Sequence, residues 1–403
     1  MGSSRNDPAC DPETSPSPIS LAALFWLFLH FGSLAFGGPV AQIAMIRAEL
    51  VDRRHWIAPD RFNRLLAVVQ ALPGPEAHEL CVHLGIVARG RIGGFLAGAG
   101  FMLPGFILMV LIAWAYRDWL QGSAQFAPAL LGIQLAVLII IARAVQRIGT
   151  HILSTSLFWL LAGVAFVATS FAVPFWIPLV AGGLISATAR RPFIPIIIGC
   201  VAAGVGWTYA AGPDPRAIAT ATPTIGVDVF SLFVAGLKGG LLTFGGAYTA
   251  IPYIRADTVQ RGWLSDAAFL DGVAFANIIP APLVIFATFT GFIVGGLLGA
   301  LAITVGMFLP AFAFSMIFFE RLEGIVDHPK LTNMLNGTAA AVVGVIAATL
   351  LQFASVTVAS VTDTGAAVAI IVGAIALIAL IGSKWVTPLL IAGAGVAGWV
   401  LTP

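Results

Sequence analysis

Long runs of apolar positions without any acidic or basic residue dominate the chain. These uncharged runs cover 14–46, 92–116, 119–142, 148–189, 192–213, 272–319, 331–362, 364–383 and 385–403. A membrane-spanning helix needs about 20 mostly apolar residues, so nearly every run has room for at least one crossing. The runs are continuously apolar and do not alternate, which favours helices over a transmembrane barrel. The pattern predicts an all-α polytopic membrane protein.

Two polar segments interrupt this pattern. Residues 1–17 are rich in Ser and Pro and are predicted to form a disordered N-terminal tail. Residues 212–227 contain several Pro and Thr residues and are predicted to be a linker. The tail and the linker leave two long apolar parts, 18–211 and 228–403.

The two apolar parts resemble each other. Phe36-Gly37-Gly38 recurs 208 positions later as Phe244-Gly245-Gly246. Further matches follow in the same order, with one-residue gaps: Ile43, Ile46, Arg47, Arg54, Trp56, Pro73, Pro75, Gly100 and Pro104 correspond to Ile251, Ile254, Arg255, Arg261, Trp263, Pro280, Pro282, Gly306 and Pro310. Collinear Gly, Pro, Arg and Trp residues are not explained by shared hydrophobicity. We therefore interpret 18–211 and 228–403 as two transporter repeats.

Basic residues predict that the two repeats have opposite orientations. Lys and Arg accumulate in cytoplasmic loops, and the loop after Gly38 carries five arginines where its second copy keeps only Arg255 and Arg261. Most of the charges fit if 18–52 and 60–89 are hairpins that enter and leave on the cytoplasmic side, although Arg117, Arg216, Arg255 and Arg261 then lie outside. The following segments then make five crossings: 92–116, 126–148, 153–172, 174–189 and 193–211. Five is odd, so the second repeat starts outside and is inverted.

Composition narrows the class of protein further. Hydrophobic residues make up 59% of the chain and charged residues only 9%, far too few for a soluble domain of this length. The net charge of +2 provides no basic surface for nucleic acid. The three cysteines, Cys10, Cys81 and Cys200, are scattered and predict neither a disulfide framework nor a metal site. No cofactor is expected.

Helix breaks at matching positions of two repeats are the best sequence indication of a transport site. The first pair is Gly37-Gly38-Pro39 with Gly245-Gly246, and the second is Pro73-Gly74-Pro75 with Pro280-Ala281-Pro282. Proline suits the first turn of a helix, so Pro39 and Pro75 are predicted to begin half-helices. The free N–H groups and positive dipole end of such half-helices favour an anion. The alternative is a set of structural kinks.

Three basic residues near the breaks are candidate anion ligands. Arg47 and Arg255 occupy equivalent positions, 10 residues after Gly37 and Gly245. A guanidinium can bind a tetrahedral oxyanion through two hydrogen bonds, although both arginines could equally be interfacial. Lys238 lies inside an apolar stretch, and an intramembrane charge is a functional candidate.

A polar stripe follows the second break of the first repeat only. Glu76, Glu79 and His83 share one helix face, and a carboxylate there would compete with a bound anion unless it were protonated. These residues are candidates for proton coupling, with a solvated stripe at the cytoplasmic mouth as the alternative. Asp271 and Asn277 precede Pro280; Asp271 is a further coupling candidate and Asn277 a further substrate ligand.

The segments FGGPVAQIAMIRAELVDRRHWI, ALPGPEAHELCVHLG, FGGAYTAIPYIRADTVQRGWL and NIIPAPL resemble the chromate ion transporter family in its long form with two halves. The resemblance implies halves of opposite orientation and export of chromate from the bacterial cytoplasm, with sulfate as a related oxyanion. Two departures stand out. Many relatives have P-G-P-N-S-T-E where this chain has Pro73–Glu79, and the second copy, Pro280-Ala281-Pro282, lacks the central glycine.

The expected function is therefore that of a secondary transporter that exports chromate, and sulfate-like oxyanions, across the bacterial cytoplasmic (inner) membrane and confers chromate resistance. The alternatives are an oxyanion channel and a membrane-embedded enzyme of lipid or phosphate metabolism. An enzyme would need a nucleophile with its base or a cluster of metal ligands, and no such spacing is found in the sequence. Expected partners are the oxyanion and the lipid bilayer, without nucleic acid; a homodimer is a candidate assembly.

Overall fold

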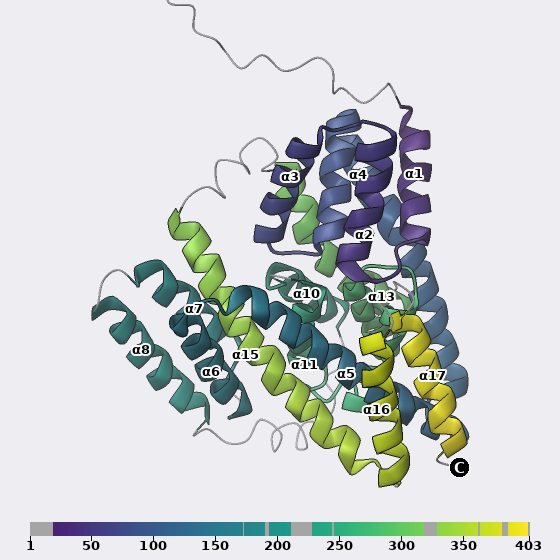
Figure 1. Cartoon of the computed structure of the whole chain (residues 1–403), viewed down its shortest axis with the longest axis vertical. Helices are drawn as coiled ribbons and strands as arrows, with labels where there is room; N and C mark the ends of the chain where they lie inside the picture. Colours follow the sequence, from purple (N-terminus) through teal and green to yellow (C-terminus); the bar gives the residue numbers. More distant parts are fainter. Residues whose placement is uncertain are drawn as a thin grey trace, which may run out of the picture.

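The computed structural model describes residues 19–171, 173–189, 193–210, 228–243, 246–317, 329–361, 363–380 and 386–401 (Figure 1). Throughout these ranges the regular structure is helical, with no strand. The tail 1–17 and the linker 212–227 lie outside the described residues.

The first repeat contributes eight α-helices within the described residues. They are α1 (Leu21–Ser33), α2 (Gly38–Arg47), α3 (Pro59–Ala71), α4 (Glu76–Ala115), α5 (Ala127–Ile152), α6 (Ser156–Ser170), α7 (Trp176–Thr188) and α8 (Phe193–Ala210). Two π-helical segments extend α2 and α4, namely η2 (Ala48–Arg53) and η3 (Tyr116–Leu120).

The second repeat follows the same order within its described part. Its α-helices are α10 (Val229–Leu241), α11 (Ile251–Thr258), α12 (Asp266–Ile278), α13 (Phe286–Ile317), α15 (Pro329–Ala359), α16 (Thr364–Leu380) and α17 (Val386–Leu401). Two short 3₁₀ segments, η4 (Ala247–Ala250) and η5 (Leu283–Ile285), precede α11 and α13.

The long helices α4 and α13 each fold back on themselves at equivalent positions. Arg89 and Gly90 have φ/ψ of −147/31° and 65/−164°, and Gly295 and Gly296 have −133/17° and 62/−155°. A residue with φ near +60° and ψ near 180° must essentially be glycine. Behind each bend, the two arms approach so closely that a methyl group on Gly85 would overlap the Gly93 backbone. Each long helix is therefore a hairpin with a short and a long arm.

A second equivalence lies where the first helix of each repeat crosses the long arm of the hairpin. Gly100 of α4 packs against the Phe25 carbonyl of α1, and Gly306 of α13 packs against the Phe233 carbonyl of α10. Glycine is required at both crossings because any side chain would meet backbone atoms there. The repeated sequence thus encodes a repeated packing geometry.

The hairpin helices and the remaining helices occupy different parts of the molecule. In Figure 1, α1–α4 lie together at one end, α10, α11 and α13 lie in the centre, and α15 runs diagonally across the front between α6 and α7 on one side and α16 on the other. Helices α5 and α15 pack on each other, and α12 contacts α5, α15 and α17. Helices α11 and α12 of the second repeat are therefore enclosed by other helices, while α1–α4 of the first repeat lie at one end of the molecule.

The predicted fold class is confirmed: the chain is an all-α polytopic membrane protein built from two repeats with broken helices. Within the described residues, four helical stretches are long and apolar enough to cross a membrane, namely Glu76–Leu120, Ala127–Ile152, Leu283–Ile317 and Asn333–Ala359. Many large apolar side chains face outward, among them Trp26, Trp159, Phe193 and Trp207, as expected of a lipid-facing surface. The opposite orientation of the repeats follows from the distribution of their basic residues.

Candidate substrate site between the repeats

The breaks of the first repeat have the predicted local structure. Gly37 and Gly38 adopt left-handed backbone conformations with φ of 88° and 78°, and α2 begins at Gly38 with Pro39 in its first turn. At the second break, Gly74 has φ of 146°, and Pro75 is the last residue before α4 begins at Glu76. The prediction that Pro39 and Pro75 begin half-helices is confirmed.

The breaks of the second repeat lie at the matching positions but continue differently. Gly246 has φ of 129° and leads into the 3₁₀ segment η4 before α11, whereas Gly245 lies outside the described residues. Pro280-Ala281-Pro282 separates α12 from η5, which then leads into α13. A short 3₁₀ turn therefore replaces the first turn of each half-helix.

Each Pro-X-Pro break packs against the other repeat. The N–H group of Gly74 donates a hydrogen bond to the carbonyl oxygen of Thr243 at 2.8 Å, and Gly74 faces the side chain of Ala311. Reciprocally, Ala281 faces Gly105. Gly74 and Ala281 are equivalent in the repeat, as are Gly105 and Ala311. This reciprocity places both breaks at the interface between the repeats, where transporter sites are expected.

Gln42 links this interface to the first Gly-Gly segment. Its Nε2 donates hydrogen bonds to the carbonyl oxygens of Ala35 at 2.8 Å and of Ala281 at 3.0 Å. The side chain is 1% exposed, and its Oε1 has no hydrogen-bond partner among the described residues. Sequence reasoning missed Gln42 because its repeat partner, Ala250, is apolar. The signal that could have found it is a single amide in the apolar stretch after Pro39.

The polar stripe of α4 begins at the first repeat's Pro-Gly-Pro break. Glu79 is fully buried, its carboxyl group lies against Gly74, and neither of its oxygens has a hydrogen-bond partner among the described residues. Glu76 lies close enough for its charge to act on Glu79. His78 is held edge-on between Phe308 and Phe312, with ring centroids 4.9 and 4.7 Å away. His83 lies one turn further along α4, within electrostatic reach of Arg61.

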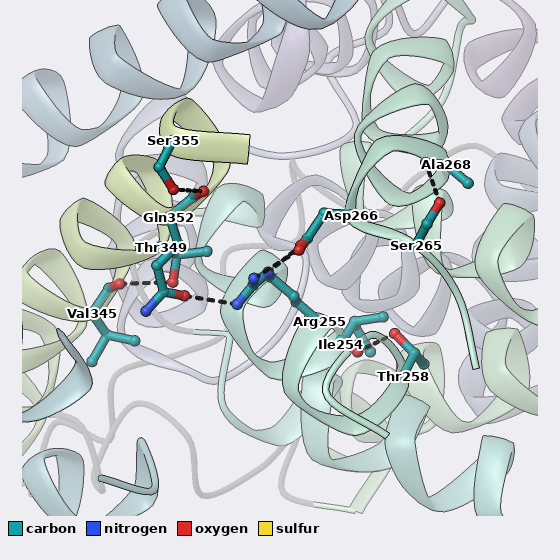
Figure 2. A network of polar contacts seen from close by, with 10 residues as sticks. All are labelled: Ile254, Arg255, Thr258, Ser265, Asp266, Ala268, Val345, Thr349, Gln352 and Ser355. Atoms are coloured by element: carbon teal, nitrogen blue, oxygen red, sulfur yellow. Dashed lines mark hydrogen bonds and ion pairs between the residues drawn. The ribbon is translucent and has the colours of Figure 1, made fainter. Parts of the chain in front are cut away.

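The two equivalent arginines are not brought together at the breaks. Arg47 is exposed at the end of α2, donates one hydrogen bond of 3.3 Å to Asn63 and lies 6.0 Å from the ring of Phe62. Arg255 is 7% exposed and donates to both carboxylate oxygens of Asp266, at 2.7 and 3.1 Å, and to Gln352 at 2.7 Å. Figure 2 shows this network, which joins α11 to α15. Each of the three guanidinium nitrogens of Arg255 thus donates a hydrogen bond to a protein group.

The remaining candidates lie in separate clusters. Lys238 forms an ion pair with Asp257 at 3.2 Å, and its side chain is 44% exposed. Asp271 accepts hydrogen bonds from Tyr116 and Gln134, both at 2.9 Å and both from the first repeat. Asn277 accepts a hydrogen bond of 2.9 Å from the Tyr248 hydroxyl, next to the second Gly-Gly segment.

The interface therefore combines glycine and proline breaks with buried polar atoms that lack hydrogen-bond partners among the described residues. A buried polar group without a hydrogen-bond partner destabilises the fold. A polar solute or water that reaches the group can supply the missing hydrogen bond. Amide and carboxyl groups of this kind can hydrogen-bond a small polar ion without a resident metal. Tyr248, Tyr116 and Gln134 were also missed from the sequence, because their partners are remote in the chain.

A helical membrane protein of two repeats, with paired helix breaks that meet at the repeat interface, is a transport protein. Comparison with known proteins identifies the type. The sequence matches the family described as "Chromate transporter" over residues 22–187 and 230–399, one match for each repeat. The chain belongs to the chromate transporter family, whose members are transport proteins and not enzymes.

Relatives share this similarity over nearly their whole length. The chain is 48% identical to the chromate transport protein of Pseudomonas aeruginosa over 97% of this chain and 95% of that protein. It is 31% identical to the probable chromate transport protein of Synechococcus elongatus, over 94% and 95%, and 29% identical to the chromate transport protein of Cupriavidus metallidurans, over 97% and 95%. No solved structure matches the chain.

Proposed function

We propose that this protein exports chromate from the bacterial cytoplasm across the inner membrane and so confers chromate resistance. Sulfate-like tetrahedral oxyanions would share the site because they have the same shape and charge. The observation that carries the proposal is the reciprocal packing of the two Pro-X-Pro breaks across the repeat interface, in a chain that is 48% identical to a chromate transport protein. The bilayer and a second copy in a homodimer are the other proposed partners.

The proposed substrate site consists of the four breaks and polar groups of the helices next to them. Arg47, at the opposite end of α2 from its break, is the candidate cation in the first repeat, and Asn277 is the candidate polar ligand in the second. Helix N-termini and glycine-rich turns present N–H groups to an anion without placing a full countercharge in the bilayer. Arg255 and Lys238 belong to the proposed site only if their present partners, Asp266 and Asp257, release them during transport.

Glu79 is the strongest candidate for proton coupling. An ionised carboxylate without hydrogen bonds or a countercharge is strongly disfavoured in an apolar interior, so the protonated form fits the described surroundings. The carboxyl group of Glu79 lies against Gly74, which in turn meets Ala311 of α13 and donates to the Thr243 carbonyl oxygen. The charged or titratable neighbours on its own helix are Glu76, His78 and His83. Asp271 would act separately, because Tyr116 and Gln134 already hydrogen-bond it.

The membrane potential alone is sufficient to drive export. Moving one charge through 100 mV is worth about 2.3 kcal/mol, so a dianion leaving a negative interior gains roughly 4–5 kcal/mol. That gain supports about a thousandfold gradient at about 1.4 kcal/mol per factor of ten. Proton coupling would add to this driving force and is not needed for export in the right direction.

Everted membrane vesicles test the proposal directly. Chromate uptake should be saturable, should increase with an inside-positive potential and should be inhibited by sulfate. Preloaded chromate should accelerate uptake by exchange, which a channel cannot do. Uptake that is absent, or linear in chromate concentration, contradicts the proposal. For coupling, Glu79→Gln should remove the response to a pH gradient at clamped potential; a response equal to that of the wild type excludes Glu79 as the coupling group.

A further inference from the structure

Two arginines that lie one turn apart on α5 have no group in the described part of the chain that neutralises them. Arg143 and Arg147 are exposed and make no side-chain hydrogen bond or ion pair with any described residue. In contrast, Arg53, Arg54, Arg117, Arg255 and Arg261 each have a carboxylate partner. Like charges four residues apart on a helix repel each other, so the pair lowers the stability of α5 unless an anion offsets it.

These arginines lie beside the Gly-Gly break of the second repeat. Ile148, the residue after Arg147, contacts Gly246, where a methyl group on the glycine would lie 4.0 Å from the Ile148 Cδ1 atom. Both arginine charges act on the Tyr248 hydroxyl, two residues after Gly246. That hydroxyl donates its hydrogen bond to Asn277, just before the Pro-Ala-Pro break. The end of α5 that carries the pair therefore lies beside the break at Gly246, where the Tyr248–Asn277 hydrogen bond joins the two breaks of the second repeat.

The topology predicted from the basic residues puts this pair on the cytoplasmic side of the break. In that topology the long arm of α4 leaves the cytoplasm after Arg91, so α5 returns toward the cytoplasm and carries Arg143 and Arg147 in its last three turns. Two cations without a counter-ion, on the path from the cytoplasm to a helix break, attract anions to that path.

We propose that Arg143 and Arg147 form a cytoplasmic capture site for a divalent tetrahedral oxyanion and deliver it to the break at Gly246, Tyr248 and Asn277. This inference rests on the proposed function and adds the entry site to it. The ligand is the free oxyanion in the cytoplasm. A phosphate headgroup of a membrane lipid offers the same chemistry, and the experiment below separates these two sources.

The test measures initial rates of chromate uptake into everted vesicles, where the cytoplasmic face is outside. The variants are Arg143→Gln with Arg147→Gln, the same two positions changed to Lys, and, as a control that removes the same charge elsewhere, Arg53→Gln with Arg54→Gln. We expect the KM for chromate to rise at least tenfold in the glutamine pair, less than threefold in the lysine pair and less than twofold in the control. Added salt should slow the wild type at low chromate more than it slows the glutamine pair.

Three results would overturn the inference: a KM in the glutamine pair within twofold of the wild type, an equal rise in the lysine pair or in the control, or an effect that disappears in reconstituted vesicles without anionic lipid. The last result would assign the arginines to lipid headgroups. Thermal unfolding in detergent is measured for every variant, so that a folding defect is recognised. If the wild type itself shows no saturable uptake, the proposed function fails, which is a different outcome from an unchanged KM in the variants.

Discussion

The two repeats place the same arginine in opposite surroundings. Arg47 and Arg255 are equivalent in sequence, yet Arg47 is exposed with a single hydrogen bond of 3.3 Å, and Arg255 is 7% exposed with three hydrogen bonds from 2.7 to 3.1 Å. Both side chains also lie over an aromatic ring, Phe62 and Phe353 respectively. The local sequence therefore sets the position of the arginine on its helix, while the surrounding helices determine the burial and the hydrogen bonds of its guanidinium group.

The difference extends to part of the helix that follows each Gly-Gly break. Ile43 and Ile46 of α2 are buried like their partners Ile251 and Ile254 of α11, but Ala44 and Arg47 are exposed where Pro252 and Arg255 are buried. The cause is packing, because α11 and α12 lie against α15, and α12 also contacts α5 and α17. A pair of repeats in which one is enclosed and the other open is expected for one state of an alternating-access cycle.

The largest expected effect comes from Arg255. Arg255→Ala leaves the carboxylate of Asp266 largely buried without its cation, which costs about 3–5 kcal/mol. Arg47→Ala should cost less than about 1 kcal/mol, because exposed contacts of this kind contribute little. Thermal unfolding in detergent, followed by tryptophan fluorescence, measures both. Equal losses of stability in the two variants would contradict the structural difference between the arginines.

A smaller effect is expected where the breaks touch the opposite repeat. Gly105→Ala should cost about 1–3 kcal/mol, because the new methyl group would overlap that of Ala281. Ala281→Gly alone should have a mild effect. Combined with Gly105→Ala, it should restore at least half of the stability that Gly105→Ala loses. The same thermal assay on all three variants gives the coupling. Additive effects would show that the Pro-Ala-Pro break does not pack against α4.

The bends of α4 and α13 should respond equally, unlike the arginines. Gly90 and Gly296 have φ of 65° and 62°, and a methyl group at either position would have no atom within 4 Å. Alanine there costs backbone strain alone, about 1–3 kcal/mol. Gly90→Ala and Gly296→Ala should therefore lower the unfolding midpoint by similar amounts. A loss confined to one variant would mean that only one of the two hairpins exists.

The smallest effect concerns a pair of equivalent carboxylates, Glu49 and Asp257. Hydrogen bonds from Arg54 and then Arg53 hold the pKa of Glu49 below its usual value of 4.5. A lowered pKa stabilises the fold above the pKa of the unfolded chain, and the contribution is lost as the pH falls through the folded value. Glu49→Gln should lower stability by under about 1 kcal/mol at pH 7, and the gap should close below about pH 4.5. The unfolding midpoints of the wild type and Glu49→Gln are measured from about pH 7 to below pH 4.5. A difference between them that grows as the pH falls would contradict a lowered pKa of Glu49.

The fold could be predicted from the sequence where local chemistry decides it. Uncharged runs, matched Gly and Pro positions and basic loops were sufficient to predict helices, two repeats and the half-helices after Pro39 and Pro75. The bend of α4 lies where Arg89 and Arg91 separate a predicted hairpin from a predicted crossing. The equivalent bend at Gly295-Gly296 lies inside an uncharged run, so nothing local marked it.

The site was less accessible to sequence reasoning because its contacts are between remote segments. Gln42 donates to Ala281, 239 positions away, and Arg255 donates to Gln352, 97 positions away. Repeat equivalence also suggested equal roles for Arg47 and Arg255, although the surroundings of the two differ. Periodicity and spacing identify which residues face inward, but only packing shows which buried groups already have partners.

One measurement tests most directly whether the equivalent residues Arg47 and Arg255 have different roles. Chromate uptake into everted vesicles is compared for Arg47→Lys and Arg255→Lys, each normalised to the amount of folded protein. Lysine keeps the charge but loses the two-pronged geometry that binds an oxyanion. We predict that Arg47→Lys raises the KM for chromate at least fivefold per folded molecule, whereas Arg255→Lys reduces the amount of folded protein and leaves the KM within twofold of the wild type. An unchanged KM in Arg47→Lys, or a raised KM in Arg255→Lys alone, would contradict the assignment of oxyanion binding to Arg47.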